Sequence, residues 1–196
     1  MPQSLSGKTV AILATDGFEQ VELTEPMKAL KDAGATVEIV SLKSGEIQGF
    51  NHFDKGGTFR VDRSLDETDP SRYEALMLPG GAHNPDQLRV EDKALEFVRA
   101  FFDAGKPVAA ICHAPWVLID AGVAEGRKLT SYKTIRTDLK NAGAEVVDEE
   151  VVVDDGLVTS RDPDDLPAFC AKMVEEFAEG RHGGDSPVTE ASHLVP

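Results

Sequence analysis

The chain has 196 residues, a formal net charge of −15 and 41% apolar residues, which fits a single globular domain with a full core. No run approaches the roughly 18 consecutive apolar residues of a membrane span, and an acidic chain without clustered Lys or Arg argues against a nucleic-acid partner. Two cysteines are too few for a disulfide framework, and the N-terminus lacks a signal-peptide pattern. We therefore expect a cytoplasmic protein with free thiols.

The N-terminal segment predicts a strand followed by a helix. Residues 8–14 form an apolar, β-branched run, and residues 18–34 then show helical spacing that ends at a glycine. Proline removes a helix hydrogen bond, so Pro26 predicts either a kink or a helix that effectively begins near Thr24. A second strand is expected at residues 36–42.

The next segment leaves the predicted core and then returns to it. Residues 43–62 carry four glycines among scattered β-forming residues, which suggests a β hairpin or excursion. Residues 73–78 predict a third central strand that runs into Gly80 and Gly81. Backbone N–H groups beside paired glycines are unobstructed, as an oxyanion pocket requires, although the pair also suits a simple tight turn.

Strand and helix patterns continue to residue 179. A single helix is predicted from about residue 84 to residue 104, with Leu88, Leu95, Val98 and Phe102 facing inward. The later elements are a short strand at 128–132, a helix at 134–142, β runs at 144–147, 151–153 and 157–160, and a helix at 163–179. Cys170 lies in the apolar stripe of that last helix, which indicates a core residue.

The chain is expected to divide into a single domain and a tail. The domain spans residues 1–180, and residues 181–196 are rich in Gly, Ser, Pro and charge. Such a composition is typical of a flexible tail, or of one that a neighbouring subunit orders.

The stretch 107–122 carries the strongest chemical signal. An apolar run at 108–111 meets a helical run at 116–119, with Cys112 and His113 at the junction and neither Gly nor Asn to relax the turn. A thiol at such a strand-to-helix elbow faces backbone N–H groups and the positive end of a helix dipole, which favour the nucleophilic thiolate. From local sequence alone, a cysteine after an apolar strand also fits a core residue.

Alternating strands and helices predict an α/β fold with a mostly parallel sheet and helices on both faces. Ligands bind at the carboxyl ends of the strands in such sheets. The turn at 16–19, the Gly80-Gly81 turn and the Cys112-His113 elbow each follow a predicted central strand. The three stretches are therefore expected to converge on one pocket.

Four motifs resemble those of the ThiJ/PfpI family of cysteine-dependent α/β proteins, within the class I glutamine amidotransferase-like superfamily. The motifs are DGFEQVEL at 16–23, LPGG at 78–81, AAICHAPW at 109–116 and SRDPDDLPAF at 160–169. The resemblance covers residues 8–179. It implies a flavodoxin-like three-layer sandwich with a small β excursion, and assembly into homodimers or larger homo-oligomers.

The resemblance also implies roles for individual residues. The family's nucleophile maps onto Cys112, its neighbouring histidine onto His113, and the acid beside the nucleophile onto Glu19. A carboxylate near a thiolate is disfavoured, so this acid should hold a proton and donate a hydrogen bond to sulfur. Asp86 resembles the acid that an adjacent subunit supplies to the histidine. Without the family, Glu19 and Asp86 also fit solvated acids in the first turns of helices.

The lining of the expected pocket follows from the same motifs. The N–H groups of Gly81 and His113 form the implied oxyanion pocket beside Gly80, and Trp116 near the elbow predicts a small cavity. His83 could line that cavity or lie in a solvated loop. The five histidines lack the spacing of a zinc site, so we expect no metal.

Three functions fit this constellation. The first is a glyoxalase or deglycase without a cofactor, which acts on methylglyoxal-type 2-oxoaldehydes or their adducts through Cys112. The second is a PfpI-type intracellular cysteine peptidase with Cys112, His113 and Asp86 as an intersubunit triad. The third is a redox-sensing or chaperone-like stress protein that uses oxidation of the same cysteine.

Overall fold

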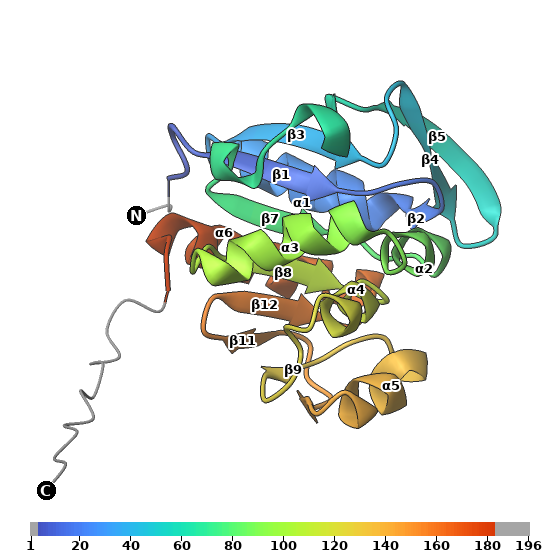
Figure 1. The fold of residues 1–196 in the computed structure, drawn as a ribbon, viewed down its shortest axis with the longest axis vertical. Helices are drawn as coiled ribbons and strands as arrows, with labels where there is room; N and C mark the ends of the chain where they lie inside the picture. The colour runs from blue at the N-terminus through green and yellow to red at the C-terminus, as the bar shows by residue number, and fades with distance from the viewer. Residues whose placement is uncertain (1–3, 183–196) are drawn as a thin grey trace, which may run out of the picture.

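A seven-stranded sheet forms the centre of the molecule in the computed structural model, which describes residues 4–182 (Figure 1). The strand order is β11-β12-β8-β7-β1-β3-β6, and every neighbouring pair is parallel except β11 with β12. The strands are β1 (Thr9–Leu13), β3 (Thr36–Ser41), β6 (Arg63–Ser64), β7 (Ala75–Leu78), β8 (Val108–Ile111), β11 (Val152–Asp154) and β12 (Leu157–Ser160). The mostly parallel sheet is confirmed.

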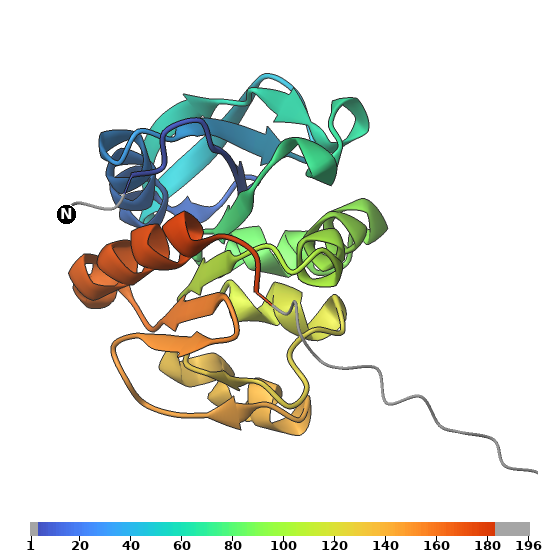
Figure 2. The ribbon, with the colours of Figure 1, turned by 90° about the vertical axis from the view of Figure 1, so that its left-hand side faces the viewer.

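Helices cover both faces of this sheet, as Figure 2 shows from the side. One layer holds α1 (Gln20–Asp32) and α6 (Leu166–Glu179), whose Leu23, Leu30, Phe169, Met173 and Phe177 are buried in one apolar cluster. The other layer holds α2 (His83–Leu88), α3 (Asp92–Asp103), α4 (Pro115–Asp120) and α5 (Arg136–Asn141). Phe97, Phe101, Val117, Leu118 and Leu139 from that layer belong to a second buried cluster. The three-layer α/β prediction is therefore confirmed.

Two small sheets lie outside this core. The strands β4 (Glu46–Asn51) and β5 (Asp54–Arg60) form an antiparallel hairpin, and β2 (Phe18–Glu19) pairs with β4. This hairpin confirms the excursion predicted for residues 43–62. The strands β9 (Lys128–Leu129) and β10 (Glu145–Val146) form the second sheet. Short 3₁₀ helices span Leu65–Glu67, Pro70–Arg72, Lys133–Ile135 and Pro163–Asp165.

The single helix predicted for residues 84–104 is wrong, because the chain forms α2 and α3 with a break between them. Leu88 and Phe97 are both buried against the same core cluster. At about 100° per residue, two positions nine residues apart would face opposite sides of one continuous helix. The chain therefore turns between the two helices, and Phe97, Val98 and Phe101 form the buried stripe of α3.

The helix α1 begins at Gln20 and contains Pro26, which rules out the later start near Thr24, one of the two predicted alternatives. Its buried stripe consists of Glu22, Leu23, Pro26 and Leu30, which places the proline on the face that packs inward. A proline at this position leaves the Glu22 carbonyl without its helical donor, and the apolar burial of the stripe offsets that loss.

Most of the predicted tail at 181–196 lies outside the described residues. Arg181 and His182 are described, and the His182 N–H donates a 2.8 Å hydrogen bond to the Gly105 carbonyl. Among residues 4–182, no helix is long and apolar enough to cross a membrane.

Candidate active site

The carboxyl ends of three adjacent strands, β1, β7 and β8, meet at one rim of the sheet. A cavity of about 530 Å³ opens there. It is lined by Glu19, Glu22, His52, Gly81, Ala82, Cys112, His113, Tyr132, Asp162, Pro163 and Asp164. The segments after β1, β7 and β8 thus contribute to one pocket, as predicted. The segment after β12 also lines it, through Asp162, Pro163 and Asp164.

Cys112 occupies a strained backbone position between β8 and α4. Its φ angle is +65°, in the left-handed region that costs a non-glycine residue about 1–2 kcal/mol. Two hydrogen bonds hold the turn: the Cys112 N–H donates to Ser160 O at 3.0 Å, and the Tyr132 N–H donates to Cys112 O at 2.9 Å. The bend aims the side chain at the cavity, where 6% of the residue remains exposed.

Two glycines allow the loop after β7 to approach this sulfur. A Cβ atom at Gly80 would lie 2.5 Å from Glu22 Oε2 and 2.7 Å from Cys112 Cβ. Gly81 has a φ of +74°, which favours glycine. The N–H groups of Gly81 and His113 donate to the sulfur and act to lower the pKa of the thiol. Their position suits the predicted oxyanion pocket, which stays a prediction as a catalytic role.

The acid that contacts Cys112 is Glu22, and the prediction that Glu19 leans over the sulfur is wrong. Glu22 is fully buried, and its Oε2 accepts the Gly80 N–H at 2.9 Å. Its carboxyl group also interacts with the Cys112 side chain, and its Oε1 is buried without a hydrogen-bond partner among the described residues. Because α1 begins at Gln20, Glu22 lies in its first turn on the face toward the sheet.

Burial governs the protonation of both partners. It raises the pKa of Glu22 to about 8, and the charge of nearby Glu19 acts in the same direction. Burial also raises the pKa of the Cys112 thiol, and a negative charge on Glu22 raises it further. Each group therefore ionises more easily when the other holds a proton, so the pair retains at least one proton at neutral pH.

His113 turns its ring back toward the cysteine that precedes it. Its Nδ1 lies 3.1 Å from Cys112 Sγ, and its Nε2 lies 3.3 Å from the Thr134 hydroxyl. The ring stacks on Tyr132 at 4.7 Å between centroids, and burial lowers the pKa of the imidazole. A neutral imidazole in this position can accept a proton from the thiol.

Glu19 lies at the mouth of the cavity instead of beside the sulfur. Its side chain is 13% exposed, and its Oε2 accepts the N–H of His52 at 3.1 Å. His52 comes from the turn between β4 and β5, at a φ of +58°. The excursion hairpin thus completes the cavity wall through a contact with Glu19.

Four predicted site residues do not line the cavity: Gly80, which lies behind Gly81, and His83, Asp86 and Trp116. Asp86 and His83 are exposed on α2, and within the described residues the ring nitrogens of His113 meet Cys112 and Thr134 and not Asp86. Trp116 packs edge-on against His113 at 5.4 Å, and its Nε1 donates to Asp138 at 2.8 Å. The tryptophan therefore supports the histidine from behind and does not narrow the pocket.

Glu22 could have been found in the sequence. Positions 22, 26 and 30 lie four residues apart and share the helix face that packs on the core. Glu22 is the charged residue among them. A carboxylate on an apolar helix face has either a partner or a raised pKa, and both mark functional sites.

These features define a class of protein: an α/β fold with a parallel sheet in which a strained elbow presents a cysteine to an acid, an imidazole and two backbone N–H groups. The family model of the DJ-1/PfpI family matches residues 8–176, and the chain belongs to this family.

Relatives and a solved structure agree with this assignment. Over 83% of its length the chain is 50% identical to protein/nucleic acid deglycase 2 of Escherichia coli, of which 93% is covered. Over the same share it is 48% identical to general stress protein 18 of Bacillus subtilis, of which 94% is covered. The crystal structure of Drosophila melanogaster DJ-1beta superposes with a TM-score of 0.80 at 30% identity, covering 89% of this chain and 91% of that chain.

Proposed function

We propose that the protein is a cysteine-dependent glyoxalase or deglycase that acts on 2-oxoaldehydes such as methylglyoxal, or on their adducts with amines and thiols. The observation that carries the proposal is the contact of one thiol with two proton-transfer groups, Glu22 and the Nδ1 of His113. The deglycase and stress-protein names of relatives about half identical to this chain support it.

The first step is addition of the Cys112 sulfur to the aldehyde carbon. The thiol proton passes to His113 Nδ1, 3.1 Å away, and the new C–S bond pushes the carbonyl electrons onto oxygen. The N–H groups of Gly81 and His113, which contact the sulfur, stabilise this oxygen in the proposed mechanism before it takes a proton. The product of the step is a hemithioacetal.

The second step moves a proton between adjacent carbons of the substrate. A carboxylic acid with a pKa near 8 can give its proton to the ketone oxygen and, as carboxylate, take the proton from the hemithioacetal carbon. Return of that proton to the neighbouring carbon, with loss of the hydroxyl proton of the former aldehyde carbon to the Glu22 carboxylate, yields a thioester and restores the carboxylic acid. Water then cleaves the thioester to the 2-hydroxy acid and restores the thiol, with no external oxidant or cofactor.

The size of the cavity bears on the substrate. A volume of about 530 Å³ exceeds what methylglyoxal requires, so the pocket has room for the side chain to which an adduct is attached. Since Trp116 does not narrow the entrance, we include adducts on protein side chains and small amines among the substrates.

Lactate formation from methylglyoxal and release of amine from its hemiaminal adduct test the proposal. The wild type and Cys170→Ala should form lactate at equal rates, and Cys112→Ala should not exceed the uncatalysed rate. Equal lactate formation by wild type and Cys112→Ala would refute the proposal.

The peptidase function requires more than one chain. Within the described residues, the Nε2 of His113 meets the Thr134 hydroxyl and no carboxylate. A Cys-His-Asp triad therefore requires a second subunit that brings its own Asp86, and Asp86 is exposed and accessible for this. We propose a cytoplasmic homodimer or larger homo-oligomer; peptide cleavage that disappears on dilution to monomers would support the peptidase.

A further inference from the structure

The end of the sheet opposite the active site holds a second group of titratable side chains. After α6 the chain turns at Gly180, and His182 reaches the start of β8 and β12, where its N–H donates to Gly105 O at 2.8 Å. Two glycines make room for it: a Cβ at Gly105 would lie 2.2 Å from His182 O, and one at Gly156 would lie 2.7 Å from the ring. The backbone hydrogen bond and the contacts with these two glycines therefore define the position of His182.

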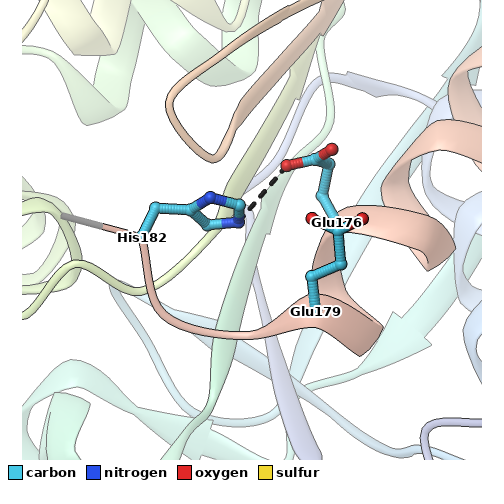
Figure 3. A group of neighbouring side chains, drawn as sticks. All are labelled: Glu176, Glu179 and His182. Atoms are coloured by element: carbon cyan, nitrogen blue, oxygen red, sulfur yellow. Dashed lines mark ion pairs between the residues drawn. The ribbon is translucent and has the colours of Figure 1, made fainter. Parts of the chain in front are cut away.

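Two acids from the last turn of α6 face this histidine. Glu176, Glu179 and His182 each offer one ligand atom, and these atoms lie within 4.8 Å of one another. Figure 3 shows the Glu176 carboxylate directed at the imidazole, with Glu179 on the next turn of the same helix. The distance from His182 Nε2 to Glu176 Oε2 is 3.3 Å.

The polar atoms of this group lack other partners within residues 4–182. The Nε2 of His182 is buried and makes no hydrogen bond there. The side chain of Glu176 is 9% exposed, and apart from its contact with His182 its carboxylate takes part in no side-chain hydrogen bond or ion pair among residues 4–182. Nine-tenths burial of an acid usually requires a paired cation or a bound metal.

Nearby cations act on Glu176, but they compensate the two acids only in part. The nearest lysine on the helix, Lys172, pairs with Glu175. Lys8 donates instead to the carbonyls of Phe177 and Ala178 at the end of α6. Lys106 and Arg127 line, together with His182, a cavity of about 140 Å³ to which neither glutamate contributes.

We propose that Glu176, Glu179 and His182 form a zinc site that fastens the residues after α6 to the end of the sheet. Two ligands on a tetrahedral zinc ion stand roughly 3.3–3.6 Å apart, given Zn–N and Zn–O distances of about 2.0–2.2 Å. The 3.3 Å between Nε2 and Oε2 fits this separation without rearrangement. Glu179 is exposed and can swing inward, and water completes the coordination.

One imidazole and two carboxylates select a first-row transition ion over magnesium, which prefers oxygen ligands and retains its water. The site lies at the amino ends of the strands, whereas the active site lies at their carboxyl ends. The proposed zinc site is therefore structural, and the activity at Cys112 does not require it.

Isothermal titration of the metal-free full chain with ZnCl₂ tests the proposal. Cys112→Ser serves as the background, so that the active-site thiol does not bind the ion. We expect one zinc per chain, and no heat from MgCl₂. His182→Gln and Glu179→Gln should each weaken zinc binding by at least about tenfold.

Glu175→Gln is the matched control, because it removes the same charge from the same helix outside the cluster and should leave zinc affinity unchanged. Zinc should also raise the melting temperature of the background protein but not that of His182→Gln. Circular dichroism verifies that each variant is folded. Equal zinc affinity in the background, His182→Gln and Glu179→Gln would overturn the proposal, as would a background protein that binds no zinc.

Discussion

The surroundings of the two cysteines differ far more than their burial does. Burial raises the pKa of both thiols, that of Cys170 to about 12. Cys170 lies on α6 beside a groove of about 410 Å³, and the ionisable group that affects its pKa is Glu25, whose charge raises it further. Cys112 instead meets a buried acid, an imidazole and two backbone N–H donors.

This difference shows what makes a buried thiol useful. Burial by itself suppresses the thiolate at both positions. At Cys112 the imidazole of His113 can accept the thiol proton, and two backbone N–H groups can stabilise the negative charge that develops. The thiol can therefore act as a nucleophile when a substrate is bound. The strained φ of Cys112 brings the sulfur to these partners, and Cys170, within a regular helix, has no comparable bend.

The largest effect on kcat/KM is expected when cysteine is replaced by alanine at position 112 and, for comparison, at position 170. Cys112→Ala removes the nucleophile and should lower kcat/KM for methylglyoxal by at least about a thousandfold. Cys170→Ala should leave it nearly unchanged. Steady-state lactate formation measures both, and a comparable loss in the two variants would erase the distinction between the cysteines.

The imidazole partner is expected to contribute next. His113→Gln removes the acceptor of the thiol proton and should lower kcat/KM by about a hundredfold. Thr134→Val removes only the hydroxyl beside Nε2 and should have a smaller effect. A loss in Thr134→Val as large as that in His113→Gln would show that the hydroxyl, not the contact with sulfur, sets the activity.

The close packing of Gly80 against Glu22 and Cys112 is expected to affect kcat/KM less than the side chains of Cys112 and His113 do. In Gly80→Ala the new methyl group must displace Glu22 Oε2 or Cys112 Cβ, so we expect about a tenfold loss of kcat/KM together with a lower melting temperature. Gly57→Ala is the control, because a Cβ there meets its nearest neighbour at 3.5 Å. Full activity of Gly80→Ala would mean that the loop tolerates a shift.

The smallest predicted effect concerns stability and not rate. Unfolded Glu22 loses its proton near pH 4.5, whereas the native residue keeps it up to about pH 8. Between these values the native state binds more protons, so the free energy of unfolding should fall as pH rises from 5 to 8. Glu22→Gln should flatten this dependence in urea titrations. Identical pH profiles for wild type and variant would contradict the raised pKa.

Much of this arrangement could be predicted from the sequence. The absence of Gly or Asn at the elbow predicted strain at Cys112, and its φ of +65° agrees. Parallel topology predicted that the turns after β1, β7 and β8 would share a rim, because the carboxyl ends of parallel strands lie together. The resemblance pointed to Glu19 and missed Glu22. Which acid of this segment faces the sulfur depends on where α1 begins, and helix boundaries are the least certain part of a pattern.

Other features could not be predicted because they depend on packing between distant segments. The break between α2 and α3 follows from the need to bury both Leu88 and Phe97. The position of the His182 side chain depends on its contacts with Gly105 and Gly156, which are far from it in sequence. No local pattern near residue 182 indicates either contact.

The most direct test compares the two glutamates of the DGFEQVEL motif in one assay. We predict that Glu22→Gln lowers kcat/KM for methylglyoxal by about a hundredfold or more, because the amide cannot hold and return the proton. Glu19→Gln, at the mouth of the cavity, should retain most of the activity. A loss in Glu19→Gln equal to or larger than that in Glu22→Gln would contradict the pairing of Glu22 with Cys112 as the catalytic unit.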